Sequence, residues 1–141
     1  MLIVSIINIY TMANTPLFVS SAIFTLVHLT SIISNGYINM FYCLVMLRGC
    51  VSSLLNHGMT SELAEYYDRI VMIESFFVDI IYMLRTGTLL SAGVPMLLSI
   101  VLYGVSKICV LHDGNSPFTD ILHICAHVCI TICHMIILHS F

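Results

Sequence analysis

Apolar residues run through almost the whole chain, and short polar stretches divide them into segments. A first apolar segment covers residues 17–34 and a second covers residues 37–55. Each has about the ~20 residues that a helix needs to cross the hydrocarbon core of a bilayer. Residues 17–55 therefore predict two N-terminal membrane helices. The short apolar lead before them, residues 1–12, is expected to lie at the membrane interface.

The longest apolar run, residues 70–111, follows the longest polar connection, residues 56–69. Within this connection Ser61 is a good helix start, because a hydroxyl accepts hydrogen bonds from the first free amides of a helix. We therefore predict an arginine-bearing helical segment over residues 61–111. Its apolar part alone would extend about 63 Å as one helix, twice the thickness of a bilayer core. We expect either a fold at Gly93-Val94-Pro95 or long helices that lie steeply tilted.

The last helix is predicted over residues 117–139, with Ser116 as its cap and Pro117 at its first position. At about 100° per residue, one side of this helix carries four titratable side chains: Asp120, His123, His127 and His134. Aligned imidazoles and a carboxylate can exchange protons near neutral pH, which predicts a proton pathway along this helix. The alternative is that these histidines only form structural hydrogen bonds inside a bundle.

Composition places these helices in a membrane. Of the 141 residues, 60% are hydrophobic and only 8% are charged, whereas a soluble domain is about 25% charged. The predicted fold class is therefore all-α, a polytopic membrane helical bundle with two long, tilted C-terminal helices. Residues 1–141 would form a single membrane domain, which leaves no room for a soluble catalytic domain.

Charge, cysteine usage and motifs exclude several other classes. The net charge is −3 and the four basic residues are scattered, so no nucleic-acid binding is expected. The six cysteines lie in apolar segments without a Cys-x-x-Cys pair, which favours buried free thiols over disulfides or a zinc site. The chain has no glycine-rich phosphate loop, no Gly-x-Ser-x-Gly and no His-Glu-x-x-His motif, so no soluble-enzyme chemistry is predicted.

Three charged residues interrupt the run at 70–111: Glu74, Asp79 and Arg85. An ionisable side chain near the centre of a membrane helix costs about +2.5 to +3.5 kcal/mol, so three of them roughly cancel the gain from the apolar residues around them. This segment therefore needs protein or water along one face. Arg85 is expected to meet an acidic group from elsewhere or to face water. A structural ion pair with Asp79 or Asp120 is the alternative.

Leu84-Arg85, followed by Leu90 and then Ala92-Gly93, resembles the signature of subunit a of rotary F-type ATP synthases, in which a Leu-Arg pair precedes Ala-Gly within one helix. The spacing from Asp120 to His127 resembles the acidic residue and glutamine, seven apart, of that family's final helix. Five positions depart from the family pattern: Leu89 stands for Asn, Val94 for a polar residue, Asp120 for Glu, His127 for Gln and Cys129 for an aromatic residue.

The resemblance implies a non-catalytic proton-channel subunit of the membrane-embedded Fo sector, in the mitochondrial inner membrane. Arg85 would attract the ionised carboxylate of each subunit c in a rotating c-ring and block proton leak between two half-channels. Protons would move through the other titratable groups: Glu74, Asp79, Asp120, His123, His127 and His134. The implied partners are the c-ring, other membrane subunits of a large complex and the lipid bilayer. No cofactor is implied.

Three other interpretations stay open. His28 and a histidine of the last helix would suit a haem between helices, as in the haem- and quinone-binding membrane anchors of complexes such as succinate dehydrogenase. Thr25-Leu26-Val27-His28 is similar to the Ser-x-x-His of such anchors. His123 and His127, one turn apart, are also spaced to bind a metal ion. A supernumerary subunit with only a packing role is the third.

Overall fold

The described residues of the computed structural model, 14–35, 39–114 and 116–141, are almost entirely helical. They contain no strand, which confirms the predicted all-α class. The interfacial segment expected at residues 1–12 lies outside the described residues. The helices are α2 (Thr15–Ser34), α3 (Met40–Gly58), α4 (Glu62–Thr86), α5 (Leu89–Asp113) and α6 (Pro117–Leu138).

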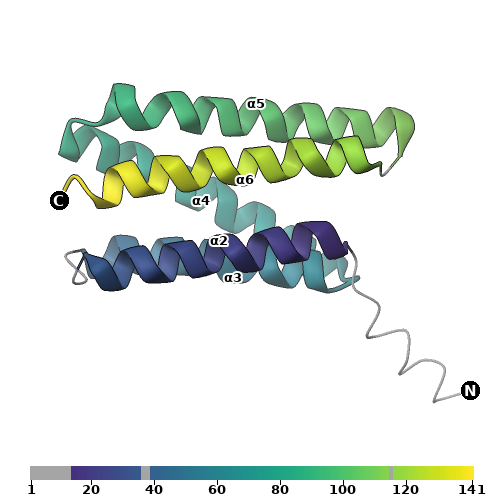
Figure 1. The fold of residues 1–141 in the computed structure, drawn as a ribbon, viewed down its shortest axis with the longest axis horizontal. Helices are drawn as coiled ribbons and strands as arrows, with labels where there is room; N and C mark the ends of the chain where they lie inside the picture. The colour runs from purple at the N-terminus through teal and green to yellow at the C-terminus, as the bar shows by residue number, and fades with distance from the viewer. Residues whose placement is uncertain (1–13, 36–38, 115) are drawn as a thin grey trace, which may run out of the picture.

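Consecutive helices run antiparallel along one long axis, with short connections at both ends of the bundle (Figure 1). The hairpin of α5 and α6 makes the most extensive helix pair. Helix α6 also packs on α2 and touches α4, while α3 lies between α2 and α4. The last helix is therefore the central element of the bundle, and its side chains meet neighbours on several faces.

Three of the described helices, α2, α5 and α6, are long and apolar enough to cross a membrane. Their outward side chains are strongly apolar: Leu90 and Leu111, for example, are 85% and 84% exposed. Such a surface is stable against lipid and not against water. The structure therefore supports a membrane protein, and two of the three candidate spans are the C-terminal helices that the sequence predicts.

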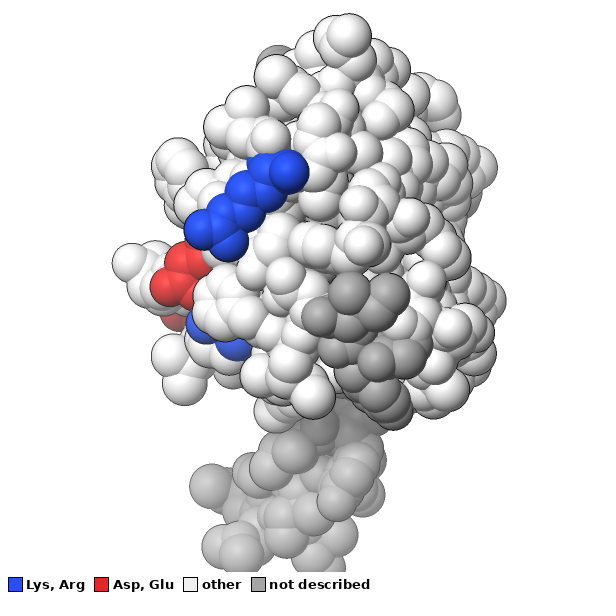
Figure 2. All heavy atoms as spheres, turned by 90° about the vertical axis from the view of Figure 1, so that its left-hand side faces the viewer, with Lys and Arg blue, Asp and Glu red and all other residues white. Residues whose placement is uncertain are grey.

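Helix α4 carries most of the charge of the bundle. Its exposed charges are largely paired, Glu65 with Arg69 and Glu74 with Arg48 of α3. Viewed along the bundle from the end at which the C-terminus lies, the charged atoms that are visible gather on one side of this face (Figure 2). The outer face of α4 thus carries most of the exposed charge, next to exposed apolar side chains such as Leu63 and Phe77.

Polar caps set the helix starts. The side chain of Ser61 accepts a hydrogen bond from the amide of Ala64, and Ser116 and Thr119 form a reciprocal capping box, as predicted for both serines. Asn14 caps α2, which therefore starts at Thr15 and not at residue 17 as expected. The polar connection predicted over residues 56–69 is mostly helical, and only residues 59–61 join α3 to α4.

The predicted fold at Gly93 is wrong, because the chain turns at Gly87. Gly87 ends α4 in the left-handed conformation (φ 71°), and the amide of Thr88 reaches back to the carbonyl of Met83 at 3.0 Å. Glycine adopts this conformation without a Cβ penalty, so it ends helices in this way more often than other residues do. Gly93 and Pro95 both lie inside α5, which continues past them.

Candidate functional site

A continuous chain of hydrogen bonds crosses four helices in the interior of the bundle. The ring of His28 in α2 bonds the carbonyl of Phe24 through Nδ1 (2.7 Å) and Nδ1 of His134 through Nε2 (2.9 Å). Nε2 of His134 in α6 lies 3.1 Å from Oδ2 of Asp79 in α4. The hydroxyl of Tyr42 in α3 donates to Oδ1 of Asp79 (2.9 Å). We call these four side chains the relay.

The ends of the relay fix how many protons it holds. The Phe24 carbonyl only accepts, so Nδ1 of His28 carries a hydrogen, and the Tyr42 hydroxyl already supplies the hydrogen of its own bond to Asp79. Two bonds remain, from His28 to His134 and from His134 to Asp79. Each of these two bonds needs one hydrogen. If each ring carries one hydrogen and Asp79 is ionised, only the hydrogen of His134 is available for them. One further proton is therefore required to satisfy the whole chain.

This extra proton has three equivalent places in the hydrogen-bond pattern. It can reside on Asp79 with both rings neutral, on His134 as an imidazolium beside ionised Asp79, or on His28 with His134 in its other tautomer. All four hydrogen bonds are satisfied in each arrangement, and the net charge is zero each time. Asp79 is only 2% exposed, and a shared proton avoids the large cost of burying an uncompensated carboxylate.

Polar and aromatic groups continue from the relay toward the end of α4. The rings of Tyr42 and Tyr82 pack at 4.8 Å, and the hydroxyl of Tyr82 donates to Asn39 (3.1 Å). The guanidinium of Arg85 lies over the Tyr82 ring, 5.7 Å from its centroid, a cation–π geometry. Arg85 itself is exposed, and no carboxylate pairs with it among the described residues.

A second group of histidines lies nearer the start of α6 than His134. His123 and His127 stack on each other (5.0 Å between centroids, 15° between planes), and His57 of α3 meets them edge-on at 5.0 and 5.8 Å. We call His57, His123 and His127 the triad. Tyr103 of α5 packs edge-on against His123 at 5.1 Å, so one aromatic ring covers the triad on the side of α5.

One cavity of about 450 Å³ adjoins both groups. Its wall is mainly apolar and draws on all five described helices, but it includes His28, Asp79 and His134 of the relay and His123 and His127 of the triad. Polar groups beside a space of this size meet the conditions under which buried water is stable. The cavity thus adjoins both histidine groups and opens to the surface, where exposed side chains such as Ile73 and Phe77 also line it.

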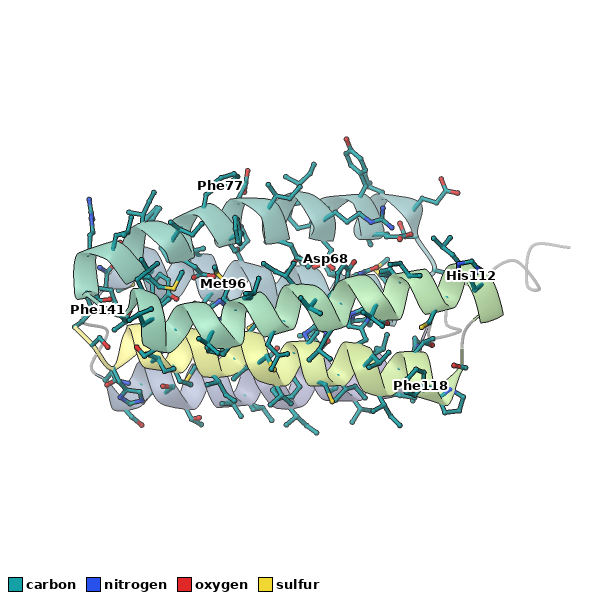
Figure 3. All side chains as sticks on the ribbon, turned by 90° about the horizontal axis from the view of Figure 1, so that it is seen from above. Asp68, Phe77, Met96, His112, Phe118 and Phe141 are labelled. Carbon is teal, nitrogen blue, oxygen red and sulfur yellow. The ribbon has the colours of Figure 1, made fainter. Side chains whose placement is uncertain are left out.

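Asp68 is a second buried carboxylate beside this cavity. It is 5% exposed and points from α4 into the bundle, whereas Phe77 of the same helix points outward (Figure 3). Its two oxygens accept from the hydroxyl of Ser52 (2.7 Å) and the amide of Asn56 (2.8 Å). These bonds hold the carboxylate against α3.

The residues predicted for the proton pathway do not form one line. Asp79 and His134 meet in the relay, and His123 and His127 meet in the triad. Asp120 lies at the start of α6, where it accepts a hydrogen bond from the side-chain amide of Asn14 (2.9 Å). Glu74 lies on the surface in its ion pair with Arg48. The structural pairing of Arg85 with Asp79 or Asp120, weighed as an alternative, is absent among the described residues.

Four side chains of the candidate site were missed or left without a role by sequence reasoning: Tyr42, His57, Asp68 and, as a member of the relay, His28. Tyr42 and His57 lie in α3, outside the stripe of Arg48, Ser52 and Asn56 that recurs every four residues, so the sequence does not distinguish them from ordinary packing residues. Asp68 lies in a stretch interpreted as a surface connection. A helix start at Ser61 was predicted, but that Asp68 faces the bundle interior and the cavity is decided by how α4 packs on α3.

Two details bear on the family resemblance and on the haem interpretation. Leu84-Arg85 ends α4, whereas Ala92-Gly93 belongs to α5, so the two parts of the signature are not in one helix as the resemblance implies. His28 and His134 are hydrogen-bonded to each other and therefore do not face each other across a space that would hold a haem.

No protein-family model matches the chain, and neither a curated protein nor a solved structure is significantly similar to it.

Proposed function

We propose that the chain conducts protons within the membrane, as one subunit of a larger proton-translocating complex. The relay of His28, His134, Asp79 and Tyr42 carries this proposal. Ionisable residues inside a membrane bundle are costly and mark proton or ion pathways. Here they form one uninterrupted hydrogen-bonded chain, and that chain holds a proton with three equivalent positions.

Transfer along the relay takes two hops. The proton on Oδ2 of Asp79 moves to Nε2 of His134, and the hydrogen on Nδ1 of His134 then moves to Nε2 of His28. No heavy atom needs to move, and no net charge is created in the bundle. The cavity beside His28, His134 and Asp79 gives water a route by which to deliver and remove protons.

Within this class we propose subunit a of an F-type ATP synthase in the mitochondrial inner membrane as the particular role. Arg85 supports it: the side chain is exposed, without a described acidic partner, and close to the relay through Tyr82 and Tyr42. A carboxylate on a neighbouring ring of small subunits would supply the missing partner.

The role of Arg85 is tested by ATP-driven proton pumping in membranes that contain the complex. Arg85→Ala should abolish coupled pumping while the complex still assembles. Arg69→Ala is the matched control, because Arg69 is an exposed arginine of the same helix that pairs with Glu65. Retained pumping in the Arg85 variant, or the absence of a ring of small subunits among the co-purifying chains, would contradict the subunit a role.

The relay is tested separately by His134→Gln. Glutamine cannot bridge His28 and Asp79 with a ring that exchanges protons at both ends. Proton flux should fall about a hundredfold, the lower end of what a positioned acid or base contributes to proton transfer. His139→Gln, at an exposed histidine of the same chain end, should leave the flux unchanged. Equal loss in both variants would count against the relay.

The cavity supports a second candidate, a haem- or quinone-binding membrane anchor. Its volume of about 450 Å³ and its largely apolar wall with a few histidines and serines suit the ring of a quinone. The absorption spectrum of the purified complex decides between the two. A haem Soret band assigned to this subunit, or a quinone extracted in equal amount, would favour the anchor over the proton channel.

A further inference from the structure

The triad of His57, His123 and His127 brings three imidazoles from two helices to one point. One ring nitrogen of each lies within 4.8 Å of the others. His57 and His123 are each only 6% exposed. His127 is partly buried, and imidazole is the side chain that most often ligates metals in proteins.

The hydrogen bonds of the bundle separate the triad from the relay. His28 and His134 of the relay use both of their ring nitrogens in hydrogen bonds. Within the described part of the chain, no hydrogen bond is seen from any ring nitrogen of the triad, and Nε2 of His127 is fully buried without a partner. A buried nitrogen without a partner costs about 1–3 kcal/mol. One ligand at the point of convergence would satisfy all three rings.

We propose that His57, His123 and His127 bind one divalent transition-metal ion, with Zn²⁺ as the expected occupant. Neutral imidazole nitrogens are favoured ligands of Zn²⁺, and three of them leave a fourth position for water or another ligand. The ion ties the end of α3 to the middle of α6. These two helices are otherwise not a closely packed pair among the described elements.

Small side-chain rotations complete the site. Nitrogens bound to one tetrahedral zinc at about 2.0–2.1 Å lie about 3.3 Å apart, which is closer than the 4.8 Å that encloses the three rings. His123 and His127 are one turn apart on α6, and their rings already stack. His123 and His127 also line the cavity, from which an ion could reach the site.

The charges near the triad have opposite signs. Asp68 lines the same cavity and is the buried carboxylate on this side of the bundle. Lys107 lies over the Tyr103 ring, 5.4 Å from its centroid, and Tyr103 contacts His123. Asp68 offsets part of the charge of a divalent ion, and Lys107 opposes it. A water bound at the fourth position and ionised to hydroxide would offset one further unit of positive charge.

Metal titration of the full-length chain in detergent tests the proposal. The chain is stripped with a chelator and titrated with Co²⁺ alone, whose visible absorption reports on coordination. One Co²⁺ should bind per chain, and one Zn²⁺ should displace it. His57→Gln and His123→Gln should weaken binding by about a hundredfold, since even changes to groups behind a ligand cost about 10- to 100-fold. His112→Gln and His139→Gln, both at exposed histidines, are the controls.

A variant that gains an absorption band tests the site even if a glutamine variant fails to fold. His57→Cys keeps a ligand at the site and should add a near-ultraviolet thiolate-to-cobalt band that the wild-type chain lacks. No saturable Co²⁺ binding by the wild-type chain would overturn the proposal. So would wild-type affinity in the His57 and His123 glutamine variants together. Neither result depends on proton transport, so these experiments test the metal site independently of the proposed function.

Discussion

Asp79 shows at the level of one residue how the bundle accommodates an acid. Its carboxylate is almost fully buried, yet Tyr42 donates to one oxygen and His134 lies at hydrogen-bond distance from the other. The surrounding interior is apolar, so a charged Asp79 without these partners would be strongly disfavoured. In the proposed relay, a proton shared between His134 and Asp79 avoids this cost and is also the proton that is transferred.

Asp79→Asn should therefore fold almost as well as the wild-type chain. The amide oxygen can accept from Tyr42, and the amide nitrogen can donate to Nε2 of neutral His134, which reproduces the arrangement with the proton on Asp79. We expect the free energy of unfolding in detergent to change by less than about 1 kcal/mol. Asp79→Leu leaves two buried polar groups without partners and should cost about 2–6 kcal/mol. Equal destabilisation by Asn and Leu would contradict this hydrogen-bond pattern.

Tyr42→Phe tests the far end of the relay. The ring of Tyr42 is fully buried, so the substitution keeps its packing and removes only the hydroxyl that donates to Asp79. We expect a loss of about 1.5–3 kcal/mol, the range for a hydrogen bond to a charged group. Tyr66→Phe, at a tyrosine that is 67% exposed, should change stability by less than about 0.5 kcal/mol. Thermal unfolding followed by circular dichroism measures both.

Sequence reasoning found half of the relay for a physical reason. Asp79 and His134 attract attention because charged or titratable groups are expensive in an apolar run. Tyr42 and His28 carry no such signal, since a tyrosine or a single histidine in a membrane helix is usual. Which side chains meet is decided by the packing of α2, α3 and α4 around α6, and one sequence does not specify that packing.

At the scale of the helices, the turn at Gly87 divides a run that looks continuous in hydrophobicity. Gly93-Val94-Pro95 is the stronger sequence signal for a break, because proline removes an amide donor. A helix can nevertheless continue past one missing bond, whereas the left-handed residue at Gly87 stops α4 and reverses the chain. Two glycines six residues apart therefore have opposite conformational roles.

Substitution of these two glycines by alanine should have effects of opposite sign. Gly87→Ala should destabilise the bundle by about 1–2 kcal/mol, because a Cβ is disfavoured at a φ of 71°. Gly93→Ala should stabilise it by about 0.5–1 kcal/mol, because Gly93 is helical and a Cβ there meets no atom within 4 Å. If Gly93→Ala were the more damaging change, the turn would lie at Gly93.

The last helix shows what periodicity can and cannot predict. The spacing of its histidines correctly places them on one side, and His123 and Thr131 of that side are buried. Cys133, on the opposite side, is also fully buried, because α6 has neighbours on both sides. All six cysteines are free, as expected, but only Cys43 and Cys133 are buried. A central helix has no single inward face, and its sequence does not show which neighbour each side meets.

At the scale of the whole molecule, polar groups are divided between an interior path and one outer face. The interior holds the relay, the triad and Asp68 beside a shared cavity. The outer face of α4 holds paired charges and Arg85, while the remaining outer surface is mainly apolar. Composition predicts the membrane environment of such a molecule, but the division of its charges requires the helix packing.

Proton flux through the complex with Asp79→Asn tests the central claim most directly. This substitution preserves every hydrogen bond of the relay and removes the group that gives up and takes back its proton. We predict a folded, assembled complex whose proton flux is lower by about a hundredfold. Tyr66→Phe should leave the flux unchanged. An assembled Asp79→Asn complex that moves protons at the wild-type rate would contradict the account.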